Sequence, residues 1–246
     1  MEHAIVLKPE ILGFYKNLPI TNTLLVSWIA MTVLMVVSIA ATWRVKAVPS
    51  LLQNFFELII DFGYQTVEDL AGSKKAKVFF PICMTFFLFI ITANWLGLMP
   101  GFGTITFDHK PLLRSINSDL NMTLSLALLS AFLTHFFALK YLGIKNYLKK
   151  WFSLEMFGVF LFVGFLEIVG EFTKVVSLSF RLFGNIFAGE VVLTTVSTLS
   201  EFSAFIVPLP FYFLEIIVGF VQAAVFMMLT LVFMVLLSEK HGAESH

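Results

Sequence analysis

Charged residues are scarce in this chain. Asp, Glu, Lys and Arg make up 13% of its 246 residues, whereas hydrophobic residues make up 59% and the mean hydropathy is +0.92. A soluble domain is roughly a quarter charged, so this composition excludes an ordinary soluble fold. The formal net charge is zero, which gives no electrostatic support for a nucleic-acid partner. The composition therefore predicts an integral membrane protein surrounded by membrane lipids.

Catalytic and metal-binding motifs are also lacking. The single cysteine, Cys83, excludes an internal disulfide, and no Cys/His cluster has the spacing of a zinc site. The sequence contains no P-loop and no evident nucleophile–base pair, so we expect no enzymatic activity, no cofactor and no metal. Residues 1–20 lack the clean apolar stretch of a cleavable signal peptide. We therefore expect the first apolar run to stay in the protein as a transmembrane helix.

Five apolar runs are long enough to cross a bilayer, which takes about 20 residues. No internal repeat or low-complexity segment separates them, so residues 1–246 are expected to form one membrane domain of all-α class. The last two runs exceed the length of a perpendicular crossing and are interpreted as a long tilted hairpin, turned at Pro208-Leu209-Pro210. The runs are residues 21–43, 78–98, 120–142, 154–199 and 208–238.

Residues 49–70 differ from these runs because they carry a polar stripe. Polar residues recur at steps of three and four, which places them on one face of a helix that is otherwise mostly apolar. Such a helix most simply lies in the plane of the membrane interface, and Pro49 suits its first position. The stripe consists of Ser50, Asn54, Glu57, Asp61, Gln65 and Glu68.

The distribution of lysine and arginine predicts the orientation of the chain. One set of connections holds ten of them and the other holds four, and the richer side is expected to be cytoplasmic. Residues 1–20 would then lie outside and residues 239–246 would form a cytoplasmic tail. The richer set is Arg44, Lys46, Lys74, Lys75, Lys77, Lys140, Lys145, Lys149, Lys150 and Lys240; the poorer set is Lys8, Lys16, Lys110 and Arg114.

Arg181 is the most unusual residue, because it lies near the middle of an apolar run. A charge at that depth costs a few kcal/mol on insertion scales, and a guanidinium does not deprotonate in proteins. On an ideal helix Glu167 and Asn185 both fall about 40° from Arg181, on the same face, whereas Glu190 falls about 180° away. Arg181 is therefore a candidate functional residue, and its position makes a merely snorkelling role the weaker interpretation.

The final run adds a second polar stripe. Glu215 and Gln222 are seven residues apart and lie about 20° off one line along a helix. If the last two helices are antiparallel, Glu190 can meet both residues and form a proton path toward the membrane centre. Glu167 would belong to a separate acidic group nearer the cytoplasm. Two acidic groups with a fixed cation between them suggest two offset half-channels rather than one continuous channel.

Other polar residues have simpler interpretations. Glu171 and Lys174 are spaced for an ion pair within one helix, and this interpretation is as good as a functional one. Asp119 stands at a predicted helix start, where capping explains it. His135 is alone in the middle of a run, so a buried, hydrogen-bonded histidine is favoured over a proton relay.

These residues carry a resemblance to a known family. The segment from Ser179 to Glu190, SFRLFGNIFAGE, closely resembles the signature of subunit a of the F-type ATP synthase. The segments NWLGLMP at 94–100, SDLNMT at 118–123 and QAAVF at 222–226 are similar to other parts of that family. The resemblance covers most of residues 75–240, whereas the N-terminal part agrees only in topology.

The resemblance implies a proton-translocating stator subunit of the membrane sector. Arg181 would face the ring of c subunits, each of which presents one carboxylate, and b-type peripheral-stalk subunits would complete the membrane part of an F1Fo complex. Glu215 stands where some members of the family carry histidine. The remaining residues implied for the half-channels are Glu190, Asn185 and Gln222, with Glu167 toward the cytoplasmic exit and Asp119 near the outer entrance.

Two other functions remain open from the residues alone. A stand-alone ion-coupled secondary transporter would bind an anionic substrate at Arg181, but it would be expected to show broken helices or repeat symmetry. A membrane subunit of a redox-driven proton pump would also use buried Glu and Lys residues, spread over several helices. The sequence favours a bacterial inner membrane over the mitochondrial inner membrane.

Overall fold

The computed structural model describes residues 9–16, 18–43, 51–99, 106–107, 110–144, 147, 157–198 and 207–238. In these residues five helices are long and apolar enough to cross a membrane, which confirms the predicted number of long apolar helices. Several expectations fall outside the described residues. They concern residues 1–8, Arg44, Lys46, Pro49, Ser50, Pro100 and Lys145, residues 148–156, residue 199 and residues 239–246.

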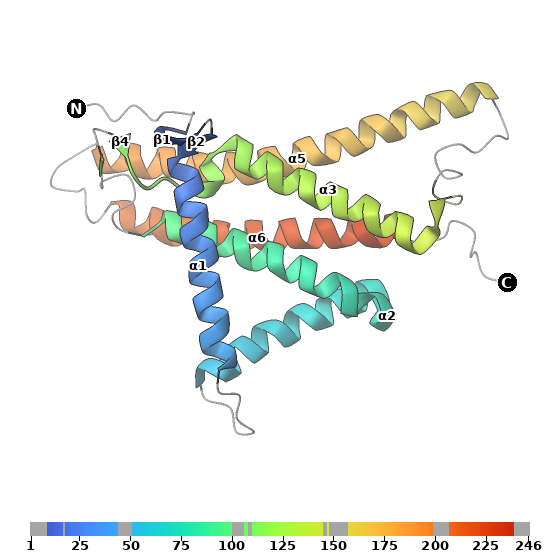
Figure 1. Ribbon diagram of the computed structural model, residues 1–246, viewed down its shortest axis with the longest axis horizontal. Helices are drawn as coiled ribbons and strands as arrows, with labels where there is room; N and C mark the ends of the chain where they lie inside the picture. Colours follow the sequence, from blue (N-terminus) through green and yellow to red (C-terminus); the bar gives the residue numbers. More distant parts are fainter. Residues whose placement is uncertain are drawn as a thin grey trace.

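The helices are arranged as an elongated bundle with one crossing helix (Figure 1). Helices α3, α5 and α6 run roughly along the long axis of the molecule, and α1 crosses their direction steeply. The described bounds are Asn22–Thr42 for α1, Leu51–Gly97 for α2, Leu120–Leu142 for α3, Phe157–Thr198 for α5 and Pro208–Ser238 for α6.

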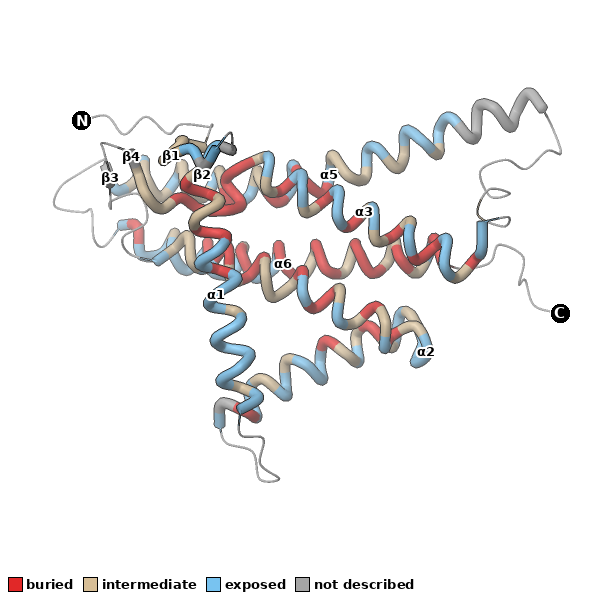
Figure 2. Tube along the Cα trace, viewed as in Figure 1, coloured by how far each residue is buried: buried red, intermediate tan, exposed pale blue. Residues whose placement is uncertain are grey.

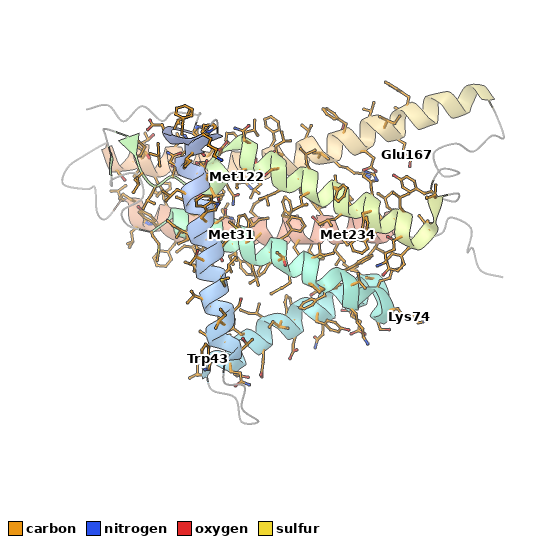
Figure 3. The ribbon with its side chains drawn as sticks, in the orientation of Figure 1. Met31, Trp43, Lys74, Met122, Glu167 and Met234 are labelled. Atoms are coloured by element: carbon orange, nitrogen blue, oxygen red, sulfur yellow. The ribbon has the colours of Figure 1, made fainter. Side chains whose placement is uncertain are left out.

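Helix α2 is bent into two arms at Gly72. This glycine has φ 73° and ψ 155°, a conformation that only glycine adopts readily. The arms fold toward one another, and the Tyr64 and Phe80 rings pack edge to face with their centroids 5.4 Å apart. The sequence predicted separate helices over 49–70 and 78–98 with a connection between them. The structure also has two helical arms, but only Gly72 separates them, so the second arm already includes the lysines expected in the connection (Figure 3, near Lys74).

The first arm of α2 is exposed over most of its length, although Val67 near the bend is fully buried. Its polar residues Asn54, Glu57 and Asp61 are exposed, and so are the apolar residues Leu58 and Phe62. An exposed polar face and an exposed apolar face suit a helix at the boundary between water and lipid. The in-plane position of this arm stays a prediction.

Helix α6 begins at Pro208, where the sequence predicted the turn of a hairpin. The backbone N–H groups in the first turn of a helix have no acceptor within the helix, so proline, which lacks an N–H, is tolerated there. The prolines therefore open the helix instead of forming the turn. The tilted hairpin of the last two helices stays a prediction, since residues 199–206 lie outside the described part of the chain.

Two short β-hairpins accompany the helices and were not part of the all-α prediction. Strand β1, Ile11–Tyr15, pairs antiparallel with β2, Leu18–Thr21, and β3, Thr106–Phe107, pairs with β4, Lys110–Pro111. Aromatic and β-branched residues favour strands, and the turn uses Lys16 at φ 56°. The hairpin leads directly into α1, whose N-cap Thr21 accepts a hydrogen bond from the Leu24 N–H at 3.3 Å.

Helix α6 is the most buried of the five long helices, and α1 and α5 are largely exposed (Figure 2). The buried apolar residues of α6, including Met227, Leu231 and Met234, pack with Phe79 of α2 and Phe137 of α3. Buried polar residues gather at the end of the bundle near the β-hairpins. They include Asn94, Arg114, Asn117, Ser118, Asp119, Glu215 and Gln222.

Candidate functional site

Arg181 projects from the exposed face of α5. Its guanidinium donates to the Ser177 hydroxyl at 3.5 Å, and no carboxylate among the described residues forms an ion pair with it. It borders a groove of about 400 Å³ whose apolar walls include Leu178, Leu229 and Phe233. The absence of a paired carboxylate in this part of the chain leaves its positive charge available to an outside group.

Two glycines lie on the face of α5 that carries Arg181. Gly170 and Gly184 each have no atom within 4 Å of the place where a side chain would begin. Glycines allow another helix to approach closely in a membrane, and here the space beside them is open. This face is therefore shaped for a close neighbour rather than for packing within the chain.

Asn185 joins the arginine face to α6. Its side chain is exposed, and the amide donates to the Gln222 Oε1 at 2.8 Å. Gln222 is buried, and its Nε2 has no hydrogen-bond acceptor among the described residues. The sequence placed Asn185 beside Arg181 and Gln222 on the facing helix, and the structure connects these two residues directly.

Glu190 points to the inner side of α5 and is half-buried. The Ser118 hydroxyl and the Arg114 guanidinium lie close enough to its carboxylate to interact with it, whereas Glu190 Oε2 is buried without a hydrogen-bond donor in the described residues. Among the described residues, Glu190 interacts with the positive charge of Arg114 and not with that of Arg181. The opposite-face arrangement expected from the helical wheel agrees with this geometry.

Glu215 of α6 faces the same interior as Glu190. It is 6% exposed, and the two carboxylates interact electrostatically. Glu215 rests against Gly189, where a Cβ atom would overlap its carboxyl group. Glycine at position 189 is therefore required by the close approach of α6. The structure brings Glu190, Glu215 and Gln222 to one region between α5 and α6.

Asp119 is buried at the start of α3. Its carboxylate accepts a hydrogen bond from the Asn121 backbone N–H and another from the Thr23 hydroxyl, both at 3.0 Å. The first bond is the predicted cap, and the second ties α3 to α1. Asp119 follows directly after Ser118, which is bonded at two points by Arg114: Nε donates to the hydroxyl and Nη2 to the carbonyl, each at 3.2 Å.

An asparagine network closes this polar region. The Asn94 amide donates to the Gly219 carbonyl at 3.0 Å, and Asn117 donates to Asn94 Oδ1 at 2.6 Å. A buried amide that loses such partners costs about 1–3 kcal/mol, so these residues fix the positions of α2 and α6. The two asparagines therefore also hold in place Glu215 and Gln222, the predicted polar residues of α6.

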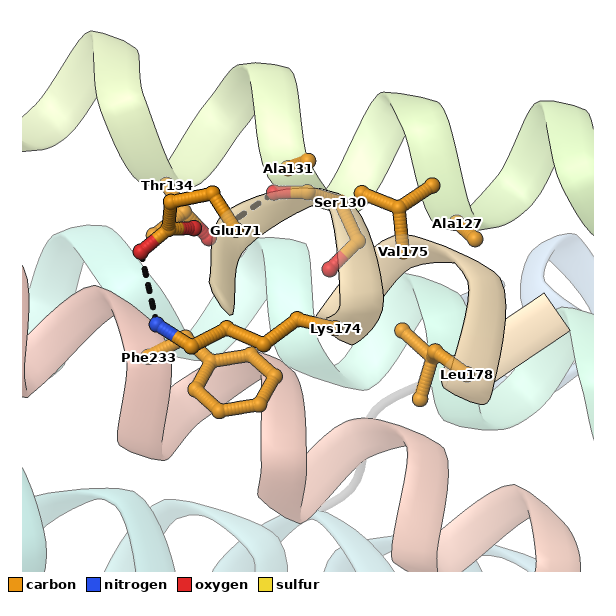
Figure 4. A pocket seen from close by; sticks show the side chains of 9 residues that line it. All are labelled: Ala127, Ser130, Ala131, Thr134, Glu171, Lys174, Val175, Leu178 and Phe233. Atoms are coloured by element: carbon orange, nitrogen blue, oxygen red, sulfur yellow. Dashed lines mark hydrogen bonds and ion pairs between the residues drawn. The ribbon is translucent and has the colours of Figure 1, made fainter. Parts of the chain in front are cut away.

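Glu167 lies apart from this region, half-buried on the distal part of α5 (Figure 3). One turn further on, Glu171 pairs with Lys174 at 2.6 Å, as the spacing suggested. Glu171 also lies 3.7 Å from His135 of α3, whose other ring nitrogen hydrogen-bonds with the Tyr147 hydroxyl at 2.9 Å. His135 is therefore hydrogen-bonded as expected, although its side chain is 30% exposed rather than buried. Figure 4 shows Glu171 and Lys174 at a small cavity between α3, α5 and α6.

Sequence reasoning missed the roles of Arg114, Asn94 and Thr23. Arg114 was counted only as a charge in a connection, and Thr23 had no distinguishing pattern. The motifs around residues 94–100 and 118–123 were the only sequence indication of this polar region, because both contain polar residues at the ends of apolar runs. Their partners could not be read from spacing, since they lie on other elements.

The sequence matches the profile of a protein family described as ATP synthase A chain over residues 24–235. The chain is a member of this family. It is 37% identical to the ATP synthase subunit a of Citrifermentans bemidjiense over 212 residues, covering 84% of this chain and 83% of that protein. The corresponding protein of Geobacter sp. (strain M21) is 36% identical over 212 residues, with the same coverage. That of Trichlorobacter lovleyi is 32% identical over 218 residues, covering 86% and 85%.

Membership in the ATP synthase A chain family confirms the resemblance first carried by the segment around Arg181. The matched region begins in α1 and reaches the last turn of α6, so it covers all or most of every described helix. All three relatives are bacterial, which supports a bacterial multi-pass membrane protein. The described site residues other than Thr23 lie inside the matched region.

Proposed function

We propose that this chain is the proton-translocating stator subunit of an F-type ATP synthase membrane sector. In this function it has no catalytic activity of its own and couples proton flow to rotation of a ring of c subunits. The family membership supports this function at the level of the subunit. The finer mechanism is inferred from the geometry of the polar residues.

The observation that carries the proposal is the outward-facing Arg181. An uncompensated guanidinium in a membrane span is costly, so it is retained where it acts on something. The open face around it accommodates a neighbouring helix, and a carboxylate on that helix would complete the charge pair. A ring of c subunits provides a succession of such carboxylates. Arg181 would hold each one ionised and prevent protons from passing directly.

The inner polar region suits an inlet half-channel. Glu190 and Glu215 lie close enough to interact, and the Asn185–Gln222 bond extends the polar surface toward Arg181. Protons would pass between these groups to reach the ring carboxylate. Asp119 lies beside Ser118 at the outer end, and we assign it to the entrance of this path.

The outlet half-channel would lie along the other side of Arg181. The groove beside the arginine extends along α5 through Gly170 toward Glu167. A proton released from the ring would follow this side to the cytoplasm. Because Arg181 separates the two sides, the half-channels are offset and do not join.

The orientation and partners follow from this function. We assign the N-terminus to the outside and the C-terminus to the cytoplasm, in agreement with the lysine-rich connections. Peripheral-stalk subunits of b type would hold the chain against the ring in a bacterial inner membrane. A secondary transporter or a redox-pump subunit receives no support from the family match.

Replacing the arginine tests the proposal. In inside-out membrane vesicles containing the assembled complex, Arg181→Ala should abolish ATP-driven acidification, because the ring carboxylate loses its counter-ion. Co-purification of the c and b subunits should be unchanged. Ser177→Ala, which removes only the contacting hydroxyl, is the matched control and should retain pumping. Full acidification by the Arg181→Ala complex would disprove the function proposed for this residue.

A further inference from the structure

A second group of titratable residues lies between α3 and α5, away from the inner polar region. His135 of α3 lies 3.7 Å from Glu171 of α5, measured from Nε2 to Oε2. The other oxygen of Glu171 accepts from the Lys174 ammonium at 2.6 Å, and the other nitrogen of His135 bonds with the Tyr147 hydroxyl at 2.9 Å. Four groups therefore form one continuous polar chain.

One end of this chain reaches the Arg181 groove. Lys174 lines that groove together with Arg181, and it also lines the small cavity beside Glu171. Its ammonium lies 5.0 Å from the centroid of the Phe233 ring, which restrains it by a cation–π contact. The cavity measures about 10 Å³, close to the smallest space that holds one water molecule, and Ser130, Thr134 and Glu171 provide polar atoms there.

The other end of the chain is open to water. The His135 and Glu171 side chains are 30% and 18% exposed, and Tyr147 follows α3 on the side where the charged connections begin. A purely structural ion pair would need only Glu171 and Lys174. Here the second carboxylate oxygen lies 3.7 Å from an imidazole that is held by Tyr147, so a small side-chain movement or one intervening water would connect the two groups for proton transfer.

We propose that Glu171 and His135 form a proton relay between the Arg181 groove and cytoplasmic water. The relay rests on the proposed function of the chain and adds two residues to its outlet. Lys174 and Tyr147 are positioning residues, which hold the Glu171 carboxylate and the His135 ring. The described residues of α6 contribute the Phe233 ring to this group.

The proton is conserved at each step. A proton released from a ring carboxylic acid into the groove binds the Glu171 carboxylate and neutralises it. Glu171 then transfers the proton to His135 Nε2 and becomes a carboxylate again, so that the imidazole carries the positive charge. The imidazolium releases a proton to water at its exposed edge and returns to its neutral form. No other reactant is consumed.

The test measures ATP-driven proton uptake by inside-out vesicles that contain the whole complex. His135→Ala and Glu171→Gln should each lower the initial rate severalfold while the complex stays assembled. Added imidazole should restore part of the rate of His135→Ala, because it can occupy the exposed site, and it should not restore Glu171→Gln. Glu68→Gln, the same substitution on the first arm of α2, is the matched control.

The outcomes separate the relay from the proposed function. A wild-type rate in either variant, or a loss in His135→Ala that imidazole does not restore, would overturn the relay. If His135→Ala does not assemble, His135→Gln replaces it, since glutamine can still bond with Tyr147; a wild-type rate there overturns the relay equally. Arg181→Ala is measured in parallel: pumping by that variant contradicts the proposed function, whereas its loss with normal pumping by His135→Ala contradicts the relay alone.

Discussion

Arg114 and Arg181 are the same residue type in opposite surroundings. Arg114 is 9% exposed and donates from two nitrogens to Ser118, whereas Arg181 is exposed and has a single 3.5 Å contact with Ser177. Arg114 also interacts with Glu190. The interior carboxylates thus have a cation of their own. Arg181 is therefore not needed to balance them and can act on a partner.

Removing the charge of Glu190 tests its place in the inlet. Glu190→Gln should slow ATP-driven proton uptake severalfold while the complex remains in the membrane, because the amide keeps the shape but does not exchange protons. The rate is measured in inside-out vesicles, with assembly checked by co-purification. Glu57→Gln, on the exposed first arm of α2, should pump normally. A normal rate in Glu190→Gln would remove Glu190 from the proton path.

Gly189 allows a second residue-level prediction. A Cβ at this position would overlap the Glu215 carboxyl group, so Gly189→Ala should displace Glu215 and lower the rate of proton uptake. The double variant Gly189→Ala with Glu215→Asp shortens the acidic side chain by one methylene and should recover part of the rate. Equal rates in the single and double variants would show that the close approach of these two residues does not limit proton flow.

The helices and strands of this chain differ in how completely their own sequences determine their shape and position. The two arms of α2 illustrate this, because both are helical by composition but their relation depends on one residue. Gly72 turns the chain, and Val67, Ala76 and Phe79 from either side of it enter a common apolar core with α3 and α6. The bend therefore brings the first arm against the bundle.

Changing Gly72 tests whether its conformation is required. Gly72→Ala should destabilise the chain by about 1–3 kcal/mol, the cost of holding a residue other than glycine in this part of backbone space. Nothing lies within 4 Å of the added methyl group, so the cost comes from the backbone alone. The midpoint of thermal unfolding of the purified complex should fall. Gly13→Ala, which also adds a methyl group to open space but at an ordinary backbone angle, should leave it unchanged.

The long helices were predictable because apolar length determines them. The number of spans and the special character of Arg181 follow from local sequence. The β1–β2 hairpin was not predicted, since its strands are short and interrupted by Pro19. The Thr23–Asp119 bond joins residues 96 positions apart, and no spacing rule reaches that far. Helical periodicity could not show that Glu171 lies near His135, because the two residues are on different helices.

At the scale of the whole molecule, packing is uneven. In the apolar window of α6, 44% of residues are buried, compared with 22% in α5 and 17% in α1. Apolar side chains exposed on a membrane protein face lipid or another protein. For α5 the exposed face also carries Arg181 and two glycines. The bundle therefore presents one specialised face, and the most buried helix supports it from behind.

The orientation of the molecule can be measured with cysteine labelling, since Cys83 is its single cysteine. In a Cys83→Ala background, Ser73→Cys should react with a membrane-impermeant maleimide from the cytoplasmic side, because it adjoins the lysines near the bend of α2. Lys16→Cys, in the turn of the β1–β2 hairpin, should react from the outside. Labelling of both cysteines from one side, or from the reversed sides, would contradict the assigned topology.

The hydrogen bonds of Asn94 and Asn117 also oppose sliding of α6 along α2. Apolar helices can slide along one another with little change in contact, whereas a hydrogen bond is lost after a shift of about an ångström. Asn94 joins the Gly219 carbonyl of α6 to Asn117, and its Cβ lies only 3.1 Å from where a side chain at Gly219 would begin. This contact locks α6 against axial movement along α2. In the proposed stator function, this lock would transmit the sideways load of a neighbouring rotor from α6 to the rest of the bundle.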